Sequence, residues 1–249
     1  MGFKDMVFRN SHQFVLDILN KLQLAVGVIE KDAQQRLSTP EAKPTGDKIT
    51  FPESVIRPVF FSDSIVLISN NNSRDSVLNL LASVEWVLQH AMQNSIPLKG
   101  AIAYGEQTAD FARSLHFGKP LIDAYELQNE LLLYGVVLHH TMEQYLTDAG
   151  IMEAFKGIRF FKYPTPLRAG IIDHYVVEWD EELLKDDVLE GMFSLLYGKV
   201  SGAPRLYVDN TKKFSEWLIE EKAKPKQLWP PVSGKKQRPT PKLHSKNSL

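Results

Sequence analysis

The sequence predicts an α+β protein in which helices pack on a mixed, mainly antiparallel sheet. Two observations support this fold class. Apolar residues recur at helical spacing in several segments, and runs rich in β-branched and aromatic residues lie between those segments. Some strand-like runs follow one another closely enough to pair as hairpins, which favours α+β over a strictly alternating α/β fold.

In the first half of the chain, Asn10 or Ser11 can cap an opening helix, and Asn70–Ser73 supply a turn and a second cap. Residues 77–91 carry an apolar stripe typical of an amphipathic helix. The expected elements are, in order, a helix over 14–22, a loop over 32–48, strands over 55–56 and 59–68, a helix over 77–91 and a strand over 98–106.

The second half continues the same mixture of helices and strands. Residues 107–116 are polar and predict a loop, and Pro120 suits the first turn of a following helix. The expected elements are a helix up to Gly135, a strand over 136–140, a helix over 141–150, strands over 158–167 and 170–179, a helix over 180–196, and a last helix capped by Asn210 or Thr211.

Composition bounds the class of protein. The chain has 249 residues, 43% hydrophobic, with a net charge of -1, which suits one sizeable soluble core and gives no global field for nucleic acid. There is no cysteine, so a disulfide framework, a thiolate metal site and a cysteine nucleophile are excluded. No apolar run reaches the roughly 18 residues of a membrane span, and the first residues lack a signal-peptide pattern. We expect a cytoplasmic protein without membrane or nucleic-acid partners.

The chain divides into a domain over 1–222 and a tail over 223–249. From Lys222 onward every charged residue is basic, and the tail is rich in Pro, Lys, Gln and Ser. A solvated, disordered extension is one interpretation. Contact with a partner or with nucleic acid is the other, although Trp229 is the only aromatic residue available for stacking on bases.

The stretch "FFSDSIVLIS" over residues 60–69 places Asp63 between two strand-like runs. Ser-Asp-Ser is good turn chemistry, so Asp63 can be a hairpin residue with no further role. A carboxylate held at a hairpin tip by two rigid strands is also well placed to bind a metal ion. The two interpretations are compatible.

Other polar groups favour structural roles. His139 and His140 are adjacent and point to opposite faces of a strand, which favours packing or capping over joint metal binding. Asp123 and Glu126 share one helix face, which favours a solvated surface. The chain lacks GxGxxG, GxxxxGK[ST], GxSxG and HExxH, so the usual dinucleotide, P-loop, hydrolase and zinc-protease signatures are absent.

Four segments carry a family resemblance. They are "GF" at 2–3, "FSDS" at 61–64, "KGAIAYGE" at 99–106 and "FGKPLIDAYELQ" at 117–128. Their order and spacing resemble a class III nucleotidyl cyclase domain over roughly residues 1–140. The resemblance implies a ferredoxin-like fold, a homodimer with the site between subunits, and a two-metal site for Mn²⁺ or Mg²⁺.

The segments are most similar to one branch, the bacterial pyrimidine cyclases of the Pycsar anti-phage defence system. Purine cyclases carry an Asn and an Arg that steady the transition state, whereas Ile122 and Glu126 stand here. "YGVVLHH" and "HYVVEWD" are also similar to this branch. The implied activity is conversion of UTP, or CTP, to the 3′,5′-cyclic nucleotide plus pyrophosphate. The product would activate a downstream effector protein.

The resemblance also implies roles for particular residues. Asp63 would bind both metal ions, the backbone N–H groups of Gly2, Phe3 and Lys4 would bind phosphates, and Lys99 would face the triphosphate. The first metal Asp of the family stands four residues before the Phe of Gly-Phe, which falls upstream of Met1. We expect upstream in-frame codons to supply it. The alternative is a degenerate cyclase fold that binds nucleotide without turnover.

Overall fold

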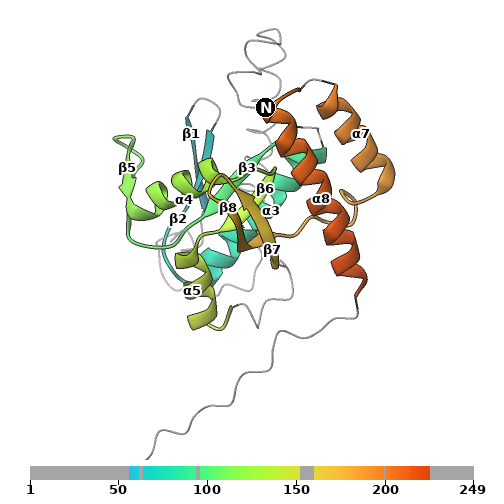
Figure 1. The fold of residues 1–249 in the computed structure, drawn as a ribbon. Coiled ribbons are helices and arrows are strands. Elements are labelled where there is room, and N and C mark those ends of the chain that lie inside the picture. Colours follow the sequence, from blue (N-terminus) through green and yellow to red (C-terminus); the bar gives the residue numbers. More distant parts are fainter. Residues whose placement is uncertain (1–55, 62–63, 94–95, 152–159, 199, 225–249) are drawn as a thin grey trace, which may run out of the picture.

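The computed structural model describes residues 56–61, 64–93, 96–151, 160–198 and 200–224. Within these residues the chain forms five helices, a mixed four-stranded sheet and two separate hairpins (Figure 1). The predicted α+β class is therefore confirmed. The ferredoxin-like arrangement stays a prediction, because the first hairpin and the four-stranded sheet are not hydrogen-bonded to each other in this part of the chain.

The four-stranded sheet has the order β3 (Lys99–Ile102), β6 (Gly135–Leu138), β8 (Gly170–Val177) and β7 (Phe160–Leu167). β3 and β6 are parallel, and the other neighbours are antiparallel. All four residues of β6 are buried, as expected for a strand with neighbours on both edges.

β7 lies at the edge of this sheet, and its position explains its prolines. Proline has no N–H to donate, so it is found on edge strands. Pro164 and Pro166 both stand in β7. The outer edge of β7 still accepts one bond, from the Leu132 N–H to the Pro166 carbonyl at 2.9 Å. The two predicted strands thus form a hairpin that tolerates two prolines.

The first small hairpin pairs β1 (Ile56–Phe61) with β2 (Ser64–Ser69) in antiparallel register. It confirms the strand prediction on both sides of the Ser-Asp-Ser interruption. Helix α3 (Arg74–Gln93) follows and packs on both strands.

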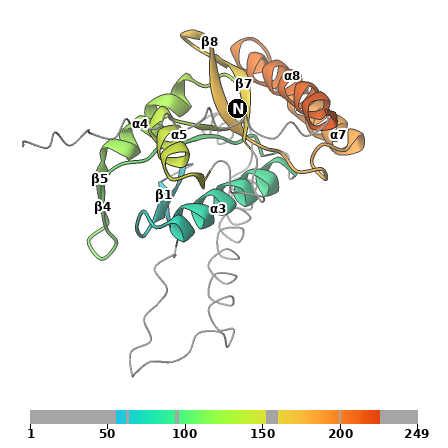
Figure 2. The same ribbon diagram turned by 90° about the horizontal axis from the view of Figure 1, so that it is seen from below.

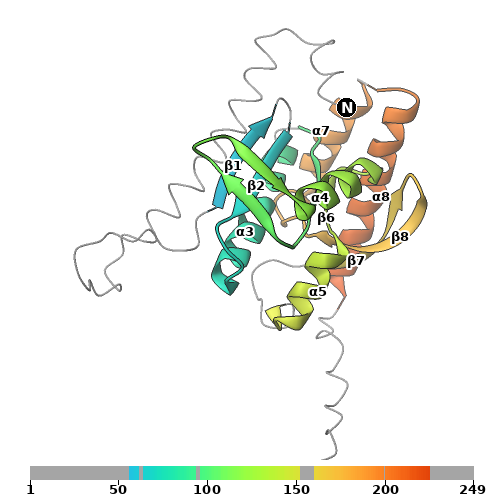
Figure 3. The ribbon, with the colours of Figure 1, turned by 90° about the vertical axis from the view of Figure 1, so that its left-hand side faces the viewer.

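The second hairpin pairs β4 (Gln107–Asp110) with β5 (Leu115–Gly118), where a polar loop was expected. That prediction is wrong, because Asp110 closes the turn by accepting the Arg113 N–H at 2.9 Å and so lets short polar strands pair. The guanidinium of Arg57 lies 4.8 Å from the centre of the Phe111 ring. This contact holds the two hairpins side by side (Figure 3).

Helix α3 begins where the sequence predicts. Asn71 accepts the Ser73 N–H through its side chain at 2.9 Å, and the Ser73 hydroxyl accepts the Ser76 N–H at 3.2 Å. The predicted apolar stripe is buried, with Leu81 and Leu88 almost completely enclosed. The turn and the cap are therefore confirmed.

The remaining helices are α4 (Lys119–Glu130), α5 (His140–Asp148), α7 (Asp186–Tyr197) and α8 (Ala203–Ala223). The last two begin elsewhere than predicted. α7 begins six residues after Asp180, because the Asp180 carboxylate accepts the Leu183 N–H at 2.7 Å in the turn before the helix. α8 begins at Ala203, well before Asn210, with a proline in its first turn.

A cluster of aromatic core residues lies where β7 and β8 meet α8 (Figure 2). Trp179 and Phe214 are fully buried, with ring centroids 5.5 Å apart and nearly perpendicular planes. Tyr163 packs 4.9 Å from Phe214 and 4.8 Å from Trp217. Such aromatic pairs add about 0.5–1.5 kcal/mol each beyond their buried area.

Several predicted elements lie outside the described residues: the helix over 14–22, the loop over 32–48 and most of the tail over 223–249. Among the helices that are described, none has the length and apolar character needed to cross a membrane.

Candidate functional site

Five residues were predicted to bind metal or nucleotide, and the structure describes one of them. Gly2, Phe3, Lys4 and Asp63 lie outside the described residues. Lys99 is described and begins β3. The structure therefore neither brings the five together nor separates them.

The strands that flank Asp63 are in place. Phe61 and Ser64 are paired at the end of the β1–β2 register, so two residues connect the strands. A hairpin was the expected setting for Asp63. Its predicted contact with metal ions stays a prediction.

The side chain of Lys99 is half-buried against the segment that follows α4 and against α8. Its Nζ donates a hydrogen bond to the Leu131 carbonyl at 3.3 Å and lies 5.2 Å from the centre of the Tyr207 ring on α8. Burial lowers the pKa of Lys99, Arg168 lowers it further, and Glu130 opposes the shift. An anion brought to this place would meet the charges of Lys99 and Arg168 together, which would favour the charged lysine. The predicted contact with a triphosphate stays a prediction.

Close packing explains why glycine stands at Gly118, the second residue of the Phe-Gly motif. A Cβ added there would lie 2.7 Å from the Glu106 carbonyl oxygen and 2.9 Å from the Gln107 Cα. These are backbone atoms and cannot easily move aside. The close approach of β4 to β5 therefore requires glycine at the start of α4.

His139 follows β6 and caps α5, which confirms the predicted capping role. Its Nδ1 accepts the Thr141 N–H at 3.5 Å and lies 2.9 Å from the Thr141 hydroxyl. Burial, and next His140, lower the pKa of His139, while Asp123 opposes them. His139 is thus favoured as a neutral, structural imidazole.

Asp123 was expected on a solvated face with Glu126, and for Asp123 this is wrong. Its side chain is only 13% exposed because it lies against the β6–α5 junction, 3.9 Å from the His139 ring nitrogen. Lys119 donates to it at 2.8 Å, which lowers the pKa of the Asp123 carboxyl. Glu126 is exposed, as predicted.

A second histidine tethers β8 to α5. His174 Nδ1 lies 3.2 Å from the Leu138 carbonyl and 3.8 Å from a Glu143 carboxylate oxygen. Glu143 raises the pKa of His174, which opposes the effect of burial. This pairing favours the protonated form of His174.

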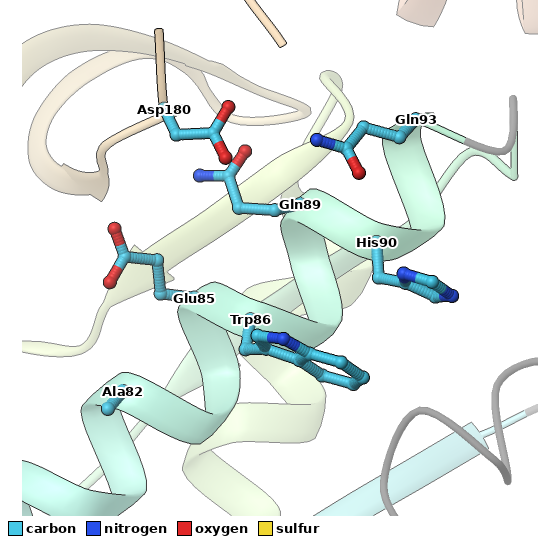
Figure 4. A pocket seen from close by; sticks show the side chains of 7 residues that line it. All are labelled: Ala82, Glu85, Trp86, Gln89, His90, Gln93 and Asp180. Atoms are coloured by element: carbon cyan, nitrogen blue, oxygen red, sulfur yellow. The ribbon is translucent and has the colours of Figure 1, made fainter. Parts of the chain in front are cut away.

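A polar pocket on α3 escaped the sequence prediction. It has a volume of about 390 Å³, and Figure 4 shows Glu85, Gln89 and Gln93 directed to one side of α3 with Asp180 opposite them. The three α3 residues recur every fourth position, so a polar stripe was visible in the sequence. Asp180 is distant in sequence, and no local pattern could connect it to that stripe.

Within the residues described, no group of three or more His, Asp or Glu side chains is arranged to hold a metal ion. No protein-family model matches the chain, and no significant match was found among curated proteins or among solved structures.

Proposed function

We propose that this chain is a pyrimidine nucleotide cyclase that converts UTP, or CTP, to the 3′,5′-cyclic nucleotide and pyrophosphate. One observation carries the proposal: the elements follow the order in which the cyclase-like motifs occur. A tight hairpin surrounds residues 62–63, α3 follows, β3 begins at Lys99, and Phe117–Gly118 leads into α4. No single motif is specific to cyclases, so the proposal rests on the order and spacing of the whole set.

The reaction needs a nucleophile, an oriented triphosphate and neutralised charge. The ribose 3′-hydroxyl gives its proton to water and its oxygen attacks the α-phosphorus. The bond from the α-phosphorus to the bridging oxygen breaks, and pyrophosphate leaves with the electron pair. Divalent ions bound in the site would lower the pKa of the 3′-hydroxyl and neutralise the triphosphate. Asp63 fits a hard divalent ion by its carboxylate chemistry.

The phosphate-binding groups would come from two parts of the chain. Backbone N–H groups near Gly2, Phe3 and Lys4 would bind phosphate oxygens if they open a helix. Lys99 would contribute its positive charge next to that of Arg168, which lowers the pKa of Lys99 as long as no anion lies between them. Because the Lys99 ammonium is already bonded to the Leu131 carbonyl, its orientation toward a ligand is partly fixed before the ligand arrives.

The arrangement of strands is compatible with a further strand. Within the described residues, β2 pairs only with β1 and β3 pairs only with β6. α3 packs on both β2 and β6, so the hairpin and the sheet share one helix. A strand between β2 and β3 would join them into one sheet. If the resemblance holds, this additional strand would carry the first metal-binding Asp of the family.

A homodimer is part of the proposal, and one surface suits it. Leu115, Phe117, Ile122 and Tyr125 are 46%, 57%, 57% and 62% exposed on β5 and α4. Such large apolar groups gathered over two adjoining elements are typical of an interaction surface. A second copy of the chain is the occupant that the proposal assigns to it.

Product formation from each nucleoside triphosphate tests the proposal. The purified chain, and the chain extended through its upstream in-frame codons, are incubated with UTP, CTP, ATP or GTP and Mn²⁺. We expect a cyclic pyrimidine nucleotide that Asp63→Ala abolishes. Asp173→Ala is the matched control, because Asp173 is an exposed carboxylate on β8, and it should leave the rate unchanged.

The second candidate is a nucleotide-binding module without turnover. Tight binding of a triphosphate with no release of pyrophosphate by either chain would support this alternative and reject the cyclase.

A further inference from the structure

The pocket on α3 lies outside the proposed nucleotide site. Its wall consists of side chains from the second half of α3 and of Asp180, which follows β8 (Figure 4). A volume of about 390 Å³ falls within the range of small-molecule pockets.

The pocket region carries an excess of negative charge. Glu85 and Asp180 line it, and Glu178 lies close enough to act on Glu85. In the part of the chain that the structure describes, Lys222 from α8 is the cation that acts on Glu85, and it is bonded to Glu178 at 2.5 Å. With Glu85 ionised, three carboxylates face one ammonium, so the region favours a further cation.

Gln89 supplies an acceptor that lacks a donor. The residue is only 7% exposed, and its Nε2 donates to the Glu178 carbonyl at 2.9 Å, which fixes the orientation of the amide. Among the described residues, its buried Oε1 has no hydrogen-bond partner. Buried acceptors in native proteins almost always have a donor. Gln89 therefore points independently to a ligand that donates a hydrogen bond.

An aromatic wall borders the carboxylates. The Trp86 and His90 rings stack in parallel planes, 3° apart in tilt and with centroids separated by 5.1 Å. The face of an indole ring attracts a cation and also packs against methylene groups. The wall suits a ligand that has both an ammonium group and a short hydrocarbon chain.

We propose that this pocket binds a small organic ammonium ion, such as a linear diamine, between the Glu85 carboxylate, the Gln89 carbonyl oxygen and the Trp86 ring. An ammonium group supplies the donors that Gln89 lacks and the charge that the carboxylates favour. A bare divalent ion fits less well, because the described residues hold no group of three ligands for a metal.

Binding should depend on pH. Burial, with Glu178 and Asp180, raises the pKa of Glu85 to about 7, while Lys222 lowers it. Among the described residues, these charged groups act on Glu85 from the segment after β8 and from α8, and His90 lies on the same helix as Glu85. Glu85 loses its charge as the pH falls through about 7, so affinity for the ammonium ion should fall with it.

Calorimetric titration with 1,4-diaminobutane tests the proposal on the full chain, with 1,4-butanediol as the neutral counterpart. At about pH 8 the diamine should bind at least about tenfold more tightly than the diol, and Glu85→Gln should weaken diamine binding about tenfold or more. Glu216→Gln is the matched control, since that carboxylate is exposed on α8. Trp86→Leu provides a second variant and should also weaken binding.

Three results would overturn the proposal. The diamine and the diol could bind equally or not at all. Glu85→Gln and Trp86→Leu could bind the diamine as well as the unmodified chain does. Binding confined to a lysine amide, used as a mimic of a basic peptide side chain, would assign the pocket to a protein partner instead.

Discussion

Replacing Lys222 by Met should destabilise the fold strongly, because it leaves a buried carboxylate without its partner. Lys222 Nζ lies 2.5 Å from the Glu178 carboxylate, and the two side chains are 12% and 8% exposed. The same ammonium donates to the Trp179 carbonyl at 3.0 Å. Methionine keeps much of the aliphatic length of lysine and removes both interactions.

The expected loss follows from this burial. Removing one partner of a buried ion pair costs about 3–5 kcal/mol, because the remaining charge is left in a poor solvent. For a chain of this size the melting temperature should fall by roughly 6–20 °C.

Urea denaturation of matched variants measures the effect. Lys212→Met is the control, because Lys212 and Glu216 are about half exposed or more and 3.9 Å apart. It should change the free energy of unfolding by no more than about 0.5 kcal/mol. Adding Glu178→Gln to Lys222→Met should recover part of the loss. A Lys222→Met loss no larger than that of Lys212→Met would refute the reasoning.

Four further substitutions test other parts of the structure by urea denaturation. Gly118→Ala should lower the free energy of unfolding by about 1–3 kcal/mol because the Cβ meets backbone atoms, whereas Gly191→Ala, in a helix with open space, should raise it by about 0.5–1 kcal/mol. Glu85→Gln should stabilise the fold more at about pH 8 than at about pH 5. The folded pKa of about 7 lies above the ordinary 4.5, so stability is lost as pH rises through that window. His174→Gln should cost more at about pH 5.5 than at about pH 8.5, because a raised histidine pKa gives stability below its ordinary value of 6.5.

For each of these predictions, a particular result would contradict the structural reasoning. Equal losses for the two glycine variants would contradict the close approach of β4 to β5. A Glu85→Gln effect that does not change with pH would contradict the raised pKa of that carboxyl. A His174→Gln loss that grows toward alkaline pH would contradict the pairing with Glu143.

The sequence predicted the elements that carry a long periodic pattern. Residues 77–91 place an apolar group on one face of every turn, and α3 buries that face. The β7–β8 hairpin was also predictable, because two long strand-like runs flank a short turn. These elements depend mainly on local pattern and burial.

The errors fall where a short element depends on a particular contact. β4 and β5 have four residues each, too few to show alternation against a polar background. α7 begins late because the Asp180 side chain binds the Leu183 N–H in a turn outside the helix. α8 begins early because Pro204 suits a first helical turn, a signal that the stronger capping residues at 210–211 concealed.

The candidate site and the α3 pocket were predictable to different degrees. The hairpin around Asp63 follows from turn chemistry between two apolar strands. The surroundings of Lys99 do not, since Leu131 and Tyr207 reach it from distant parts of the chain. The bond between Gln89 and the Glu178 carbonyl likewise spans 89 residues. Contacts of that range are set by the tertiary fold.

The most direct test of the central proposal is mass-spectrometric detection of the product formed from UTP or CTP with Mn²⁺. The account predicts a 3′,5′-cyclic pyrimidine nucleotide with release of pyrophosphate, and predicts that Asp63→Ala abolishes both. The assay includes the chain from Met1 and the chain extended upstream. If neither forms a cyclic nucleotide from any of the four triphosphates, the account is contradicted.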